Sequence, residues 1–165
     1  MQYSIDCLCE IISGGTPKTS SQEYWNGEIP WLSIKDFINV NRFVYTAEKS
    51  ITTLGLNHSS TNLLAKNDII ISARGTVGKI AIVGKPMTFN QSCYGLRTKD
   101  SNILSQYYLF YWLKSHQLDI ETGTHGAVFD TITRQDFNRL KINLPTIYAQ
   151  NHIVNTISFL LLKSL

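Results

Sequence analysis

Apolar positions follow a strand-like pattern through the first two-thirds of the chain, and turn-forming residues interrupt it often. Residues 69–71 are consecutive isoleucines, which is typical of a short buried strand, and Lys66-Asn67-Asp68 before them is a turn signal. Gly75-Thr76-Val77-Gly78 interrupts the pattern, which resumes at residues 79–83. Turn signals this frequent predict a compact, twisted β-rich subdomain that closes near residues 95–98, and they disfavour a βαβ repeat.

Beyond residue 100 the pattern becomes helical. Residues 103–121 contain helix-forming residues without glycine or proline, and their apolar side chains fall on several faces, which predicts a widely buried helix. The spacing of Thr133 and Asp136 resembles a capping box and predicts a short helix over residues 134–140. Residues 141–144 look like a last strand. We therefore expect an α+β fold, with a C-terminal helical part packed against the β-rich subdomain.

The final segment, residues 146–165, is predicted to be a helix with an apolar stripe at three- and four-residue spacing. The stripe consists of Ile153, Ile157, Leu160 and Leu161. Such a stripe packs either on its own domain or on a partner helix, and the pattern leaves both alternatives open.

Residues 14–37 form a polar loop with an unusual composition. Gly14 and Gly15 permit backbone angles closed to other residues, and hydroxyl and amide side chains follow them. Tyr24, Trp25 and Trp31 then flank a turn-like Asn26-Gly27, which predicts a loop pinned to the core by aromatic side chains. Taken alone, these residues favour an ordinary surface loop that aromatic side chains hold in place.

Composition limits the function classes. A chain of 165 residues is large enough for one domain with its own core, and a net charge of +3 is compatible with nucleic acid without arguing for it. No apolar run approaches the roughly 20 residues that span a bilayer. We expect a cytoplasmic protein, because the N-terminus lacks the pattern of a secretion signal and Cys7, Cys9 and Cys93 lack zinc-ligand spacing.

Catalytic motifs are missing from the sequence. The four prolines are never adjacent, so the Asp/Asn-Pro-Pro-aromatic motif of amino-methyltransferases does not occur. A phosphate-binding Walker A motif would need glycine and serine or threonine where the chain has Ala73 and Ile80. The histidines have no helical ligand spacing. We therefore predict a non-catalytic protein with no metal and no cofactor.

Segments in the same order as in a known family cover most of the chain. GGTPKTSSQEYWNGEIPWLSIKDF (residues 14–37), ISARGTVGKIAIV (71–83), NQSCYGL (90–96) and LPTIYAQNHIV (144–154) resemble the target recognition domain of the specificity subunit of type I restriction-modification enzymes. The resemblance implies sequence-specific binding of double-stranded DNA. It also implies that the protein directs methyltransferase (M) and restriction (R) subunits to a bipartite target.

The same resemblance divides the chain. Residues 1–145 correspond to one target recognition domain and residues 146–165 to the start of a spacer helix, which in this family pairs as an antiparallel coiled coil. Family members usually hold two such domains and two helices. One of each is consistent with a half-length subunit, a degenerate copy or a fragment.

Residues suited to DNA contact lie mainly in the predicted loops. Residues 75–78 allow backbone N–H groups to approach phosphates, with Arg74 and Lys79 as charge partners, and Arg74 could instead read guanine. Asn90 and Gln91 carry the donors and acceptors that read adenine. The predicted DNA-binding set is Lys18, Thr19, Lys35, Arg74, Gly75, Thr76, Gly78, Lys79, Asn90, Gln91, Thr124 and His125. From residue chemistry alone, the glycine segment is equally well a tight turn with solvated cations.

Two other function classes remain open. A GxxG loop also occurs in the KH domains that bind RNA, although there it joins two helices and here its flanks look like strands. An inactive or reservoir copy would act only as a protein-interaction domain.

Overall fold

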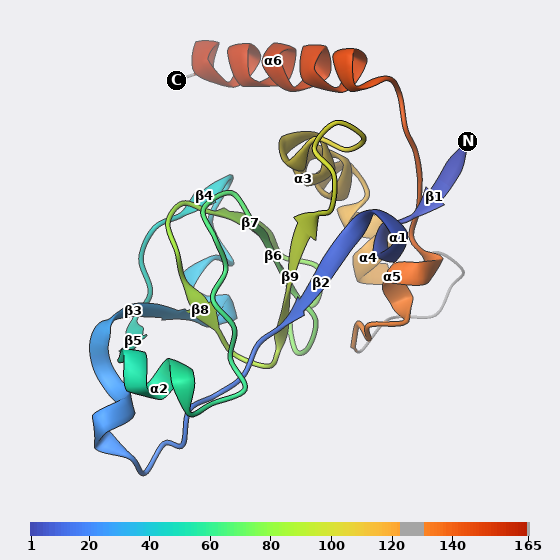
Figure 1. Ribbon diagram of the computed structural model, residues 1–165. Coiled ribbons are helices and arrows are strands. Elements are labelled where there is room, and N and C mark those ends of the chain that lie inside the picture. Colours follow the sequence, from blue (N-terminus) through green and yellow to red (C-terminus); the bar gives the residue numbers. More distant parts are fainter. Residues whose placement is uncertain (123–130, 165) are drawn as a thin grey trace.

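The computed structural model describes residues 1–122 and 131–164, and these residues form three sheets, a helical part and a long terminal helix (Figure 1). The central sheet has five strands in the order β2-β9-β6-β7-β4. Neighbouring strands are antiparallel except for the parallel pair β4–β7. The strands are β2 (Cys9–Ser13), β4 (Phe43–Val44), β6 (Ile69–Ser72), β7 (Ile80–Val83) and β9 (Cys93–Thr98).

A second sheet of three strands, in the order β5-β3-β8, packs beside the first. It consists of β3 (Trp25–Leu32), β5 (Lys49–Ile51) and β8 (Thr88–Phe89). The predicted turn at Asn26-Gly27 is wrong, because both residues lie inside β3. Trp25 and Ile29 both pair with Ile51, so the intervening residues form a bulge, and Asn26 has a φ of 60°. The short helices η1 (Gln22–Tyr24), η2 (Ile34–Asp36) and α2 (Thr53–Asn57) connect these strands.

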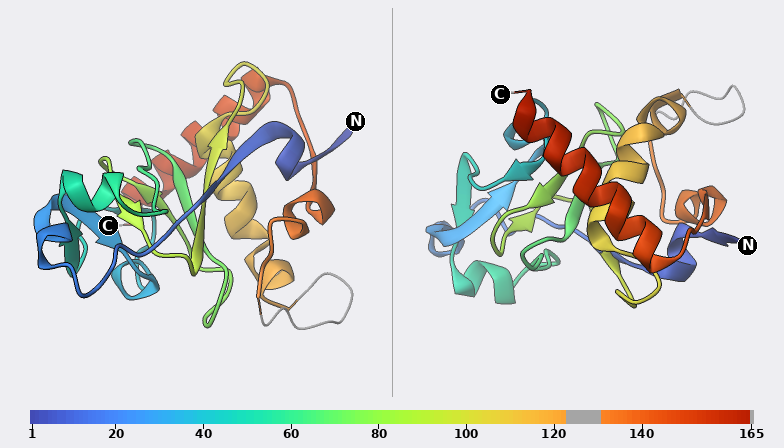
Figure 2. Two further views of the ribbon diagram at one scale, coloured as in Figure 1. Left: turned by 60° about the horizontal axis from the view of Figure 1, so that its bottom comes forward. Right: turned by 90° about the horizontal axis from the view of Figure 1, so that it is seen from above.

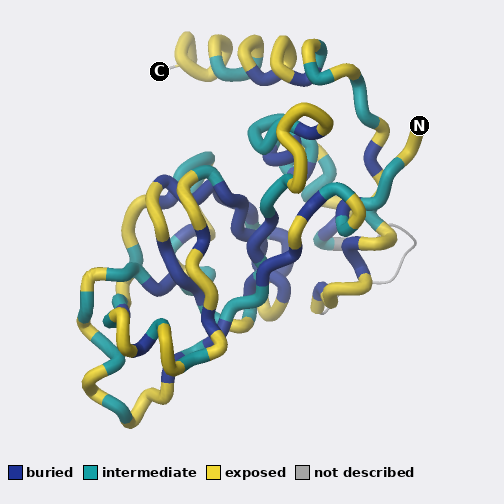
Figure 3. The backbone as a smooth tube through the Cα atoms, viewed as in Figure 1, coloured by how far each residue is buried: buried dark blue, intermediate teal, exposed yellow. Residues whose placement is uncertain are grey.

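The central strand β6 is buried on both faces, which explains its unbroken apolar run (Figure 3). Ile69 and Ile71 pack in one apolar cluster with the helical part of the chain. Ile70 packs in the other cluster with residues that include Leu32 and Phe89 of the second sheet. The central sheet is thus a layer between two cores. The mostly antiparallel, β-rich first half followed by helices confirms the predicted α+β fold.

The helical part begins later than the sequence pattern predicts, and its main helix is broken. The single helix expected at residues 103–121 is instead α3 (Gln106–Ser115) and α4 (Gln117–Thr122). Ser105 is the N-cap, because its hydroxyl accepts a hydrogen bond from the Tyr108 N–H group. The break falls at His116, whose ring stacks on Trp112 at 4.2 Å between centroids and contacts the Trp112 carbonyl oxygen.

The remaining elements of the helical part bring the N-terminal segment of the domain into contact with its C-terminal segment. Strand β1 (Gln2–Ser4) pairs with β10 (Lys141–Asn143), and α1 (Ile5–Leu8) lies against α5 (Asp136–Arg139). The predicted helix at 134–140 is shorter than expected. The predicted interaction between Thr133 and Asp136 is present, however. The Asp136 carboxylate accepts hydrogen bonds from the Thr133 N–H and hydroxyl groups at 2.7 and 2.8 Å.

The terminal helix α6 (Ile147–Lys163) packs against α3 on the outside of the domain (Figure 2, right). Gln150 in its first turns is fully buried and accepts a hydrogen bond from the Ser105 N–H group at 2.9 Å. Its amide nitrogen donates to the carbonyl oxygens of Ile103 and Pro145. Beyond Val154 the helix is largely exposed. No helix in the described ranges is long and apolar enough to cross a membrane.

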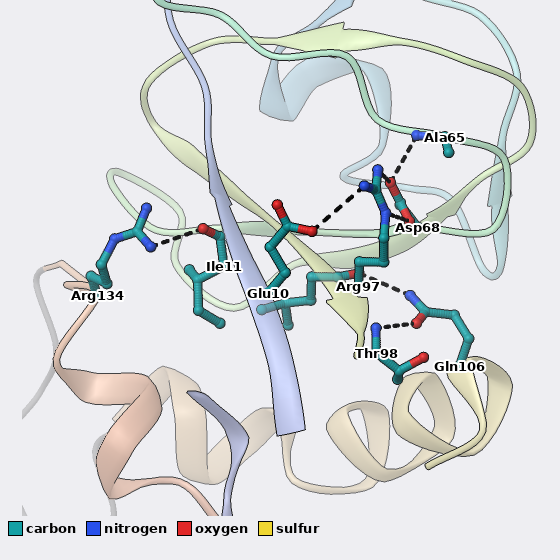
Figure 4. A network of polar contacts seen from close by, with 9 residues as sticks. Glu10, Ile11, Ala65, Asp68, Arg97, Thr98, Gln106 and Arg134 are labelled. Carbon is teal, nitrogen blue, oxygen red and sulfur yellow. Dashed lines mark hydrogen bonds and ion pairs between the residues drawn. The ribbon is translucent and has the colours of Figure 1, made fainter. Parts of the chain in front are cut away.

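Polar side chains join the strands of the central sheet to α3 (Figure 4). The Arg97 guanidinium on β9 makes two hydrogen bonds to the carboxylate of Asp68, just before β6, one of them 2.9 Å from Nε to Oδ1. The hydrogen bonds to Asp68 raise the pKa of Arg97, and this effect outweighs the decrease that burial causes. On α3, Gln106 accepts a hydrogen bond from the Thr98 N–H group and donates to the Leu96 carbonyl oxygen.

Replacing Arg97 with methionine should destabilise the fold strongly. The Asp68 side chain is only 5% exposed, so the change leaves a buried carboxylate without its cation. We expect the free energy of unfolding to fall by about 2–4 kcal/mol, measured by urea denaturation. Arg139→Met is the control, because Arg139 is 73% exposed and its partner Asp136 keeps the hydrogen bonds from Thr133. An equal, small effect of both changes would contradict the role assigned to Arg97.

Candidate nucleic-acid interface

Loops from distant parts of the sequence meet beside the ends of the central strands. We call residues 14–17, 74–78 and 90–92 the loop cluster. Gly15 donates its N–H to the Phe89 carbonyl oxygen at 3.0 Å, and the Thr16 hydroxyl donates to the Gln91 side-chain oxygen. Arg74 donates its N–H to the Ser92 carbonyl oxygen at 3.2 Å. The predicted contacts Arg74, Asn90 and Gln91 therefore lie on one connected surface, with the β6–β7 loop projecting from the sheet (Figure 2, left).

The glycine pair is a packing requirement of this cluster. A Cβ atom on Gly14 would lie 2.1 Å from the Asn90 carbonyl oxygen, so only glycine allows the two backbones to approach this closely. The indole N–H of Trp31 donates to the Gly15 carbonyl oxygen at 2.9 Å, and that of Trp25 donates to the Lys18 carbonyl oxygen at 3.2 Å. The indole rings pack edge to face at 5.2 Å. The prediction of a loop pinned by aromatic side chains is confirmed for both tryptophans.

Two adjoining hollows, of about 340 and 260 Å³, share the residues Trp31, Glu48 and Lys49. We call this continuous depression the Trp31 hollow. Its remaining lining comes from Thr16, Thr19, Trp25, Asn26 and Ser50 on one side, and from Ser33, Lys35, Asp36 and Asn90 on the other. The hollow therefore brings the predicted residues Thr19, Lys35 and Asn90 together. Lys18 is exposed on the neighbouring loop.

Sequence reasoning missed Lys49 and Glu48. Lys49 pairs with Trp31 across β3 and β5, and its ammonium group lies 6.0 Å from the centres of both indole rings. The Asp36 carboxylate fixes the adjacent wall by accepting hydrogen bonds from the N–H groups of Ser33 and Glu48 at 2.7 and 2.8 Å. These pairings are non-local, so no short motif in the sequence reports them.

The turn between β6 and β7 has an anchored base and an exposed tip. Arg74, Gly75 and Thr76 are exposed. The N–H groups of Gly78 and Lys79, by contrast, donate to the backbone oxygen and the hydroxyl of Ser72 at 2.9 and 2.8 Å. Backbone contact with phosphate, expected for all of residues 75–78, is therefore restricted to the tip. Because the turn joins two antiparallel strands, it also lacks the helix-to-helix setting of a KH loop.

Lys79 is placed differently from the other predicted cations. Its ammonium group forms an ion pair with Glu121 of α4 at 3.0 Å. Burial raises the pKa of Glu121, but the hydrogen bonds from Lys79 and Gln117 outweigh this effect and leave the pKa below its ordinary value. The Glu121 carboxylate is therefore charged at neutral pH. The predicted contacts Thr124 and His125 lie outside the described residues.

In the part of the chain that the structure describes, no three His, Cys, Asp or Glu side chains lie close enough to bind a metal ion. Burial raises the pKa of Cys9 and Cys93 to about 12, so both thiols stay protonated at neutral pH. What the surface offers is hydrogen-bonding side chains, cations and aromatic walls, which is the chemistry of nucleic-acid contact.

Comparison with known proteins gives one consistent result. A family model described as the type I restriction modification DNA specificity domain matches residues 1–162. The chain is 34% identical over 149 residues to the EcoR124I/EcoR124II specificity subunit of Escherichia coli, covering 86% of this chain and 36% of that protein. It is 28% identical over 153 residues to the MjaIX specificity subunit of Methanocaldococcus jannaschii, covering 91% and 35%.

Solved structures share the fold. The HsdS subunit of Thermoanaerobacter tengcongensis superimposes with a TM-score of 0.73 at 20% identity, covering 99% of this chain and 37% of that one. The S subunit of a type I restriction-modification system from M. genitalium gives a TM-score of 0.66 at 21% identity, covering 96% and 38%. The chain thus spans about a third of the length of the curated relatives it matches.

Proposed function

Because the chain belongs to the type I restriction modification DNA specificity family, we propose that residues 1–145 form a target recognition domain that reads one part of a bipartite DNA sequence. The domain uses no cofactor and catalyses no reaction. It acts in the cytoplasm by directing methyltransferase (M) and restriction (R) subunits to its target. The family match over residues 1–162 carries this proposal, and the loop cluster beside the Trp31 hollow supplies a surface for it.

Roles within that surface follow from exposure and charge. Arg74, at the exposed tip of its turn, reads guanine through a two-pronged hydrogen bond. Asn90 and Gln91 supply amide groups for adenine. Lys18, Lys35 and Lys49 are exposed and neutralise phosphates. Lys49 joins the set because it lies in the same hollow as Lys35 and Asn90.

The spacer helix is proposed to pair with the corresponding helix of a second recognition domain. Support comes from its exposed apolar residues past Val154, where Phe159, Leu160, Leu161 and Leu162 are each 48–73% exposed. The predicted stripe is divided by the fold: Ile153 and Leu160 are exposed, whereas Ile157 is half-buried. Each apolar side chain of this size contributes about 1.5–3 kcal/mol when it becomes fully buried.

The methylome of a cell that expresses the protein with its M subunit tests the function directly. We expect one methylated bipartite motif that appears only when both genes are present. A host lacking the gene for this chain but expressing the M subunit is the control. The absence of any new motif, with both proteins folded and associated, would exclude the proposed role.

Substitutions at Arg74 and Lys49 should weaken DNA binding in different ways. We expect Arg74→Ala to relax preference at one base pair, with a discrimination cost of about 1–3 kcal/mol. Lys49→Gln should weaken binding to all DNA sequences alike and lower the salt slope of binding by about one. Both are measured in complex with M subunits by titration of motif and scrambled duplexes at several salt concentrations. Binding unchanged in both variants would move the interface away from this surface.

Pairing through α6 should be lost when charges replace its outward apolar residues. We expect Leu160→Asp combined with Leu162→Asp to abolish self-association while the domain stays folded, because both side chains point into solvent in the single chain. Analytical ultracentrifugation measures the association and circular dichroism the fold. Asn155→Asp adds a charge on the same helix and serves as the control. If the unmodified chain is monomeric at all concentrations, pairing requires a different partner helix and the self-pairing form of the proposal fails.

A further inference from the structure

Lys79 follows the glycine turn, as a phosphate-binding lysine would, but its ammonium group is already paired with a carboxylate. Its ammonium group lies 3.0 Å from the Glu121 carboxylate on α4, and the side chains of the pair are 30% and 27% exposed. The Gln117 side chain donates to the same carboxylate oxygen at 2.9 Å. A phosphate that took Lys79 as its partner would have to break this pair and approach the Glu121 carboxylate, which would keep only the Gln117 hydrogen bond and the charge of Lys114. Like charges at that distance repel, so the arrangement opposes direct phosphate contact.

The base of the turn is pressed against the same helix. A Cβ atom on Gly78 would lie 2.8 Å from the Glu121 Cγ atom, and Gly78 has a φ of +86°. The N–H groups of Gly78 and Lys79 are both held by Ser72. At the tip the situation is the opposite, because a Cβ atom on Gly75 would meet nothing within 4 Å. The turn is thus fixed at its base next to Lys79 and open at Gly75, while the backbone of Arg74 is held by the Ser92 carbonyl oxygen.

We propose that Lys79 is a positioning residue for DNA recognition, which ties the base of the β6–β7 turn to α4 through Glu121 and thereby orients Arg74. The inference rests on the proposed function, and it gives Lys79 a role different from that of Lys49. Lys49 lies in the open hollow over two indole rings and contacts DNA itself, whereas Lys79 acts through the loop that it holds.

Exchanging the charges of Lys79 and Glu121 distinguishes a positioning role of Lys79 from direct contact with a phosphate. The proteins compared are the unmodified chain, Lys79→Glu, Glu121→Lys, the double exchange and Lys79→Gln, each in complex with M subunits. The probes are a duplex carrying the motif from the methylome and a duplex with that motif scrambled. The measured quantities are the ratio of the two dissociation constants and the slope of binding against salt. Lys66→Gln removes the same charge from the turn at the other end of β6 and should change neither quantity.

We expect each single exchange to reduce discrimination by roughly 5-fold or more, and the double exchange to restore it, as for directly coupled side chains. Lys79→Gln should lower discrimination without changing the salt slope. If Lys79 contacts a phosphate, the double exchange stays defective because a glutamate faces the DNA, and Lys79→Gln lowers the slope by about one. Either result would overturn the inference, as would full discrimination in both single exchanges.

Thermal unfolding of each variant distinguishes misplacement of the loop from loss of the fold. The milder Lys79→Gln change keeps the inference testable if a charge reversal prevents folding. A wild-type complex that does not discriminate between the duplexes refutes the proposed function itself. Discrimination by the wild type without rescue by the double exchange refutes only the role of Lys79.

Discussion

The carboxylate of Asp68 sets the constraint on which the arrangement of this domain depends. It lies at the start of the central strand, 5% exposed, and accepts hydrogen bonds from Arg97 on β9 and from the Ala65 N–H group. A buried carboxylate tolerates few alternative positions, because any shift leaves it unpaired. The pair thereby fixes β6 against β9. Since β6 is only a few residues long, fixing its start also fixes its end, where Arg74 begins the exposed turn.

The packing of the central sheet explains why the candidate DNA contacts lie on loops. Both faces of the central sheet are used by apolar clusters, so only strand ends and connections remain for polar recognition. Those loops are held by side chains outside the proposed set of DNA contacts. Trp31 holds the Gly15 carbonyl oxygen, Ser72 holds the base of the β6–β7 turn, and Asp36 holds the wall of the Trp31 hollow. The candidate contacts are positioned in this way without being buried.

The predictable parts of this structure are those with local causes. The isoleucine run predicted β6, the apolar stripe predicted α6, and the aromatic residues after Gly14 predicted a pinned loop. Features that depend on long-range pairing were not predictable from the pattern. Lys49 meets the indole rings only because β5 pairs with β3, and Lys79 meets Glu121 only because α4 packs beside the turn. The bulge at Asn26 was missed because the pairing of β3 with β5 overrides a local preference there. The helix break at His116 was missed although the contacts of His116 with Trp112 are local.

A short series of contacts connects the terminal helix α6 to the β6–β7 turn that carries Arg74. Gln150 of α6 accepts a hydrogen bond from Ser105, which caps α3. Helix α3 continues through His116 into α4, whose Glu121 pairs with Lys79 at the base of the Arg74 turn. Each contact is between groups that are buried or half-buried, so each restricts the geometry of the next. On the proposal that Lys79 orients Arg74, a partner that fixes α6 would also restrict the direction in which Arg74 points. In a two-domain assembly, the distance between half-sites would then depend on rigid packing within each domain as well as on the length of the paired helices.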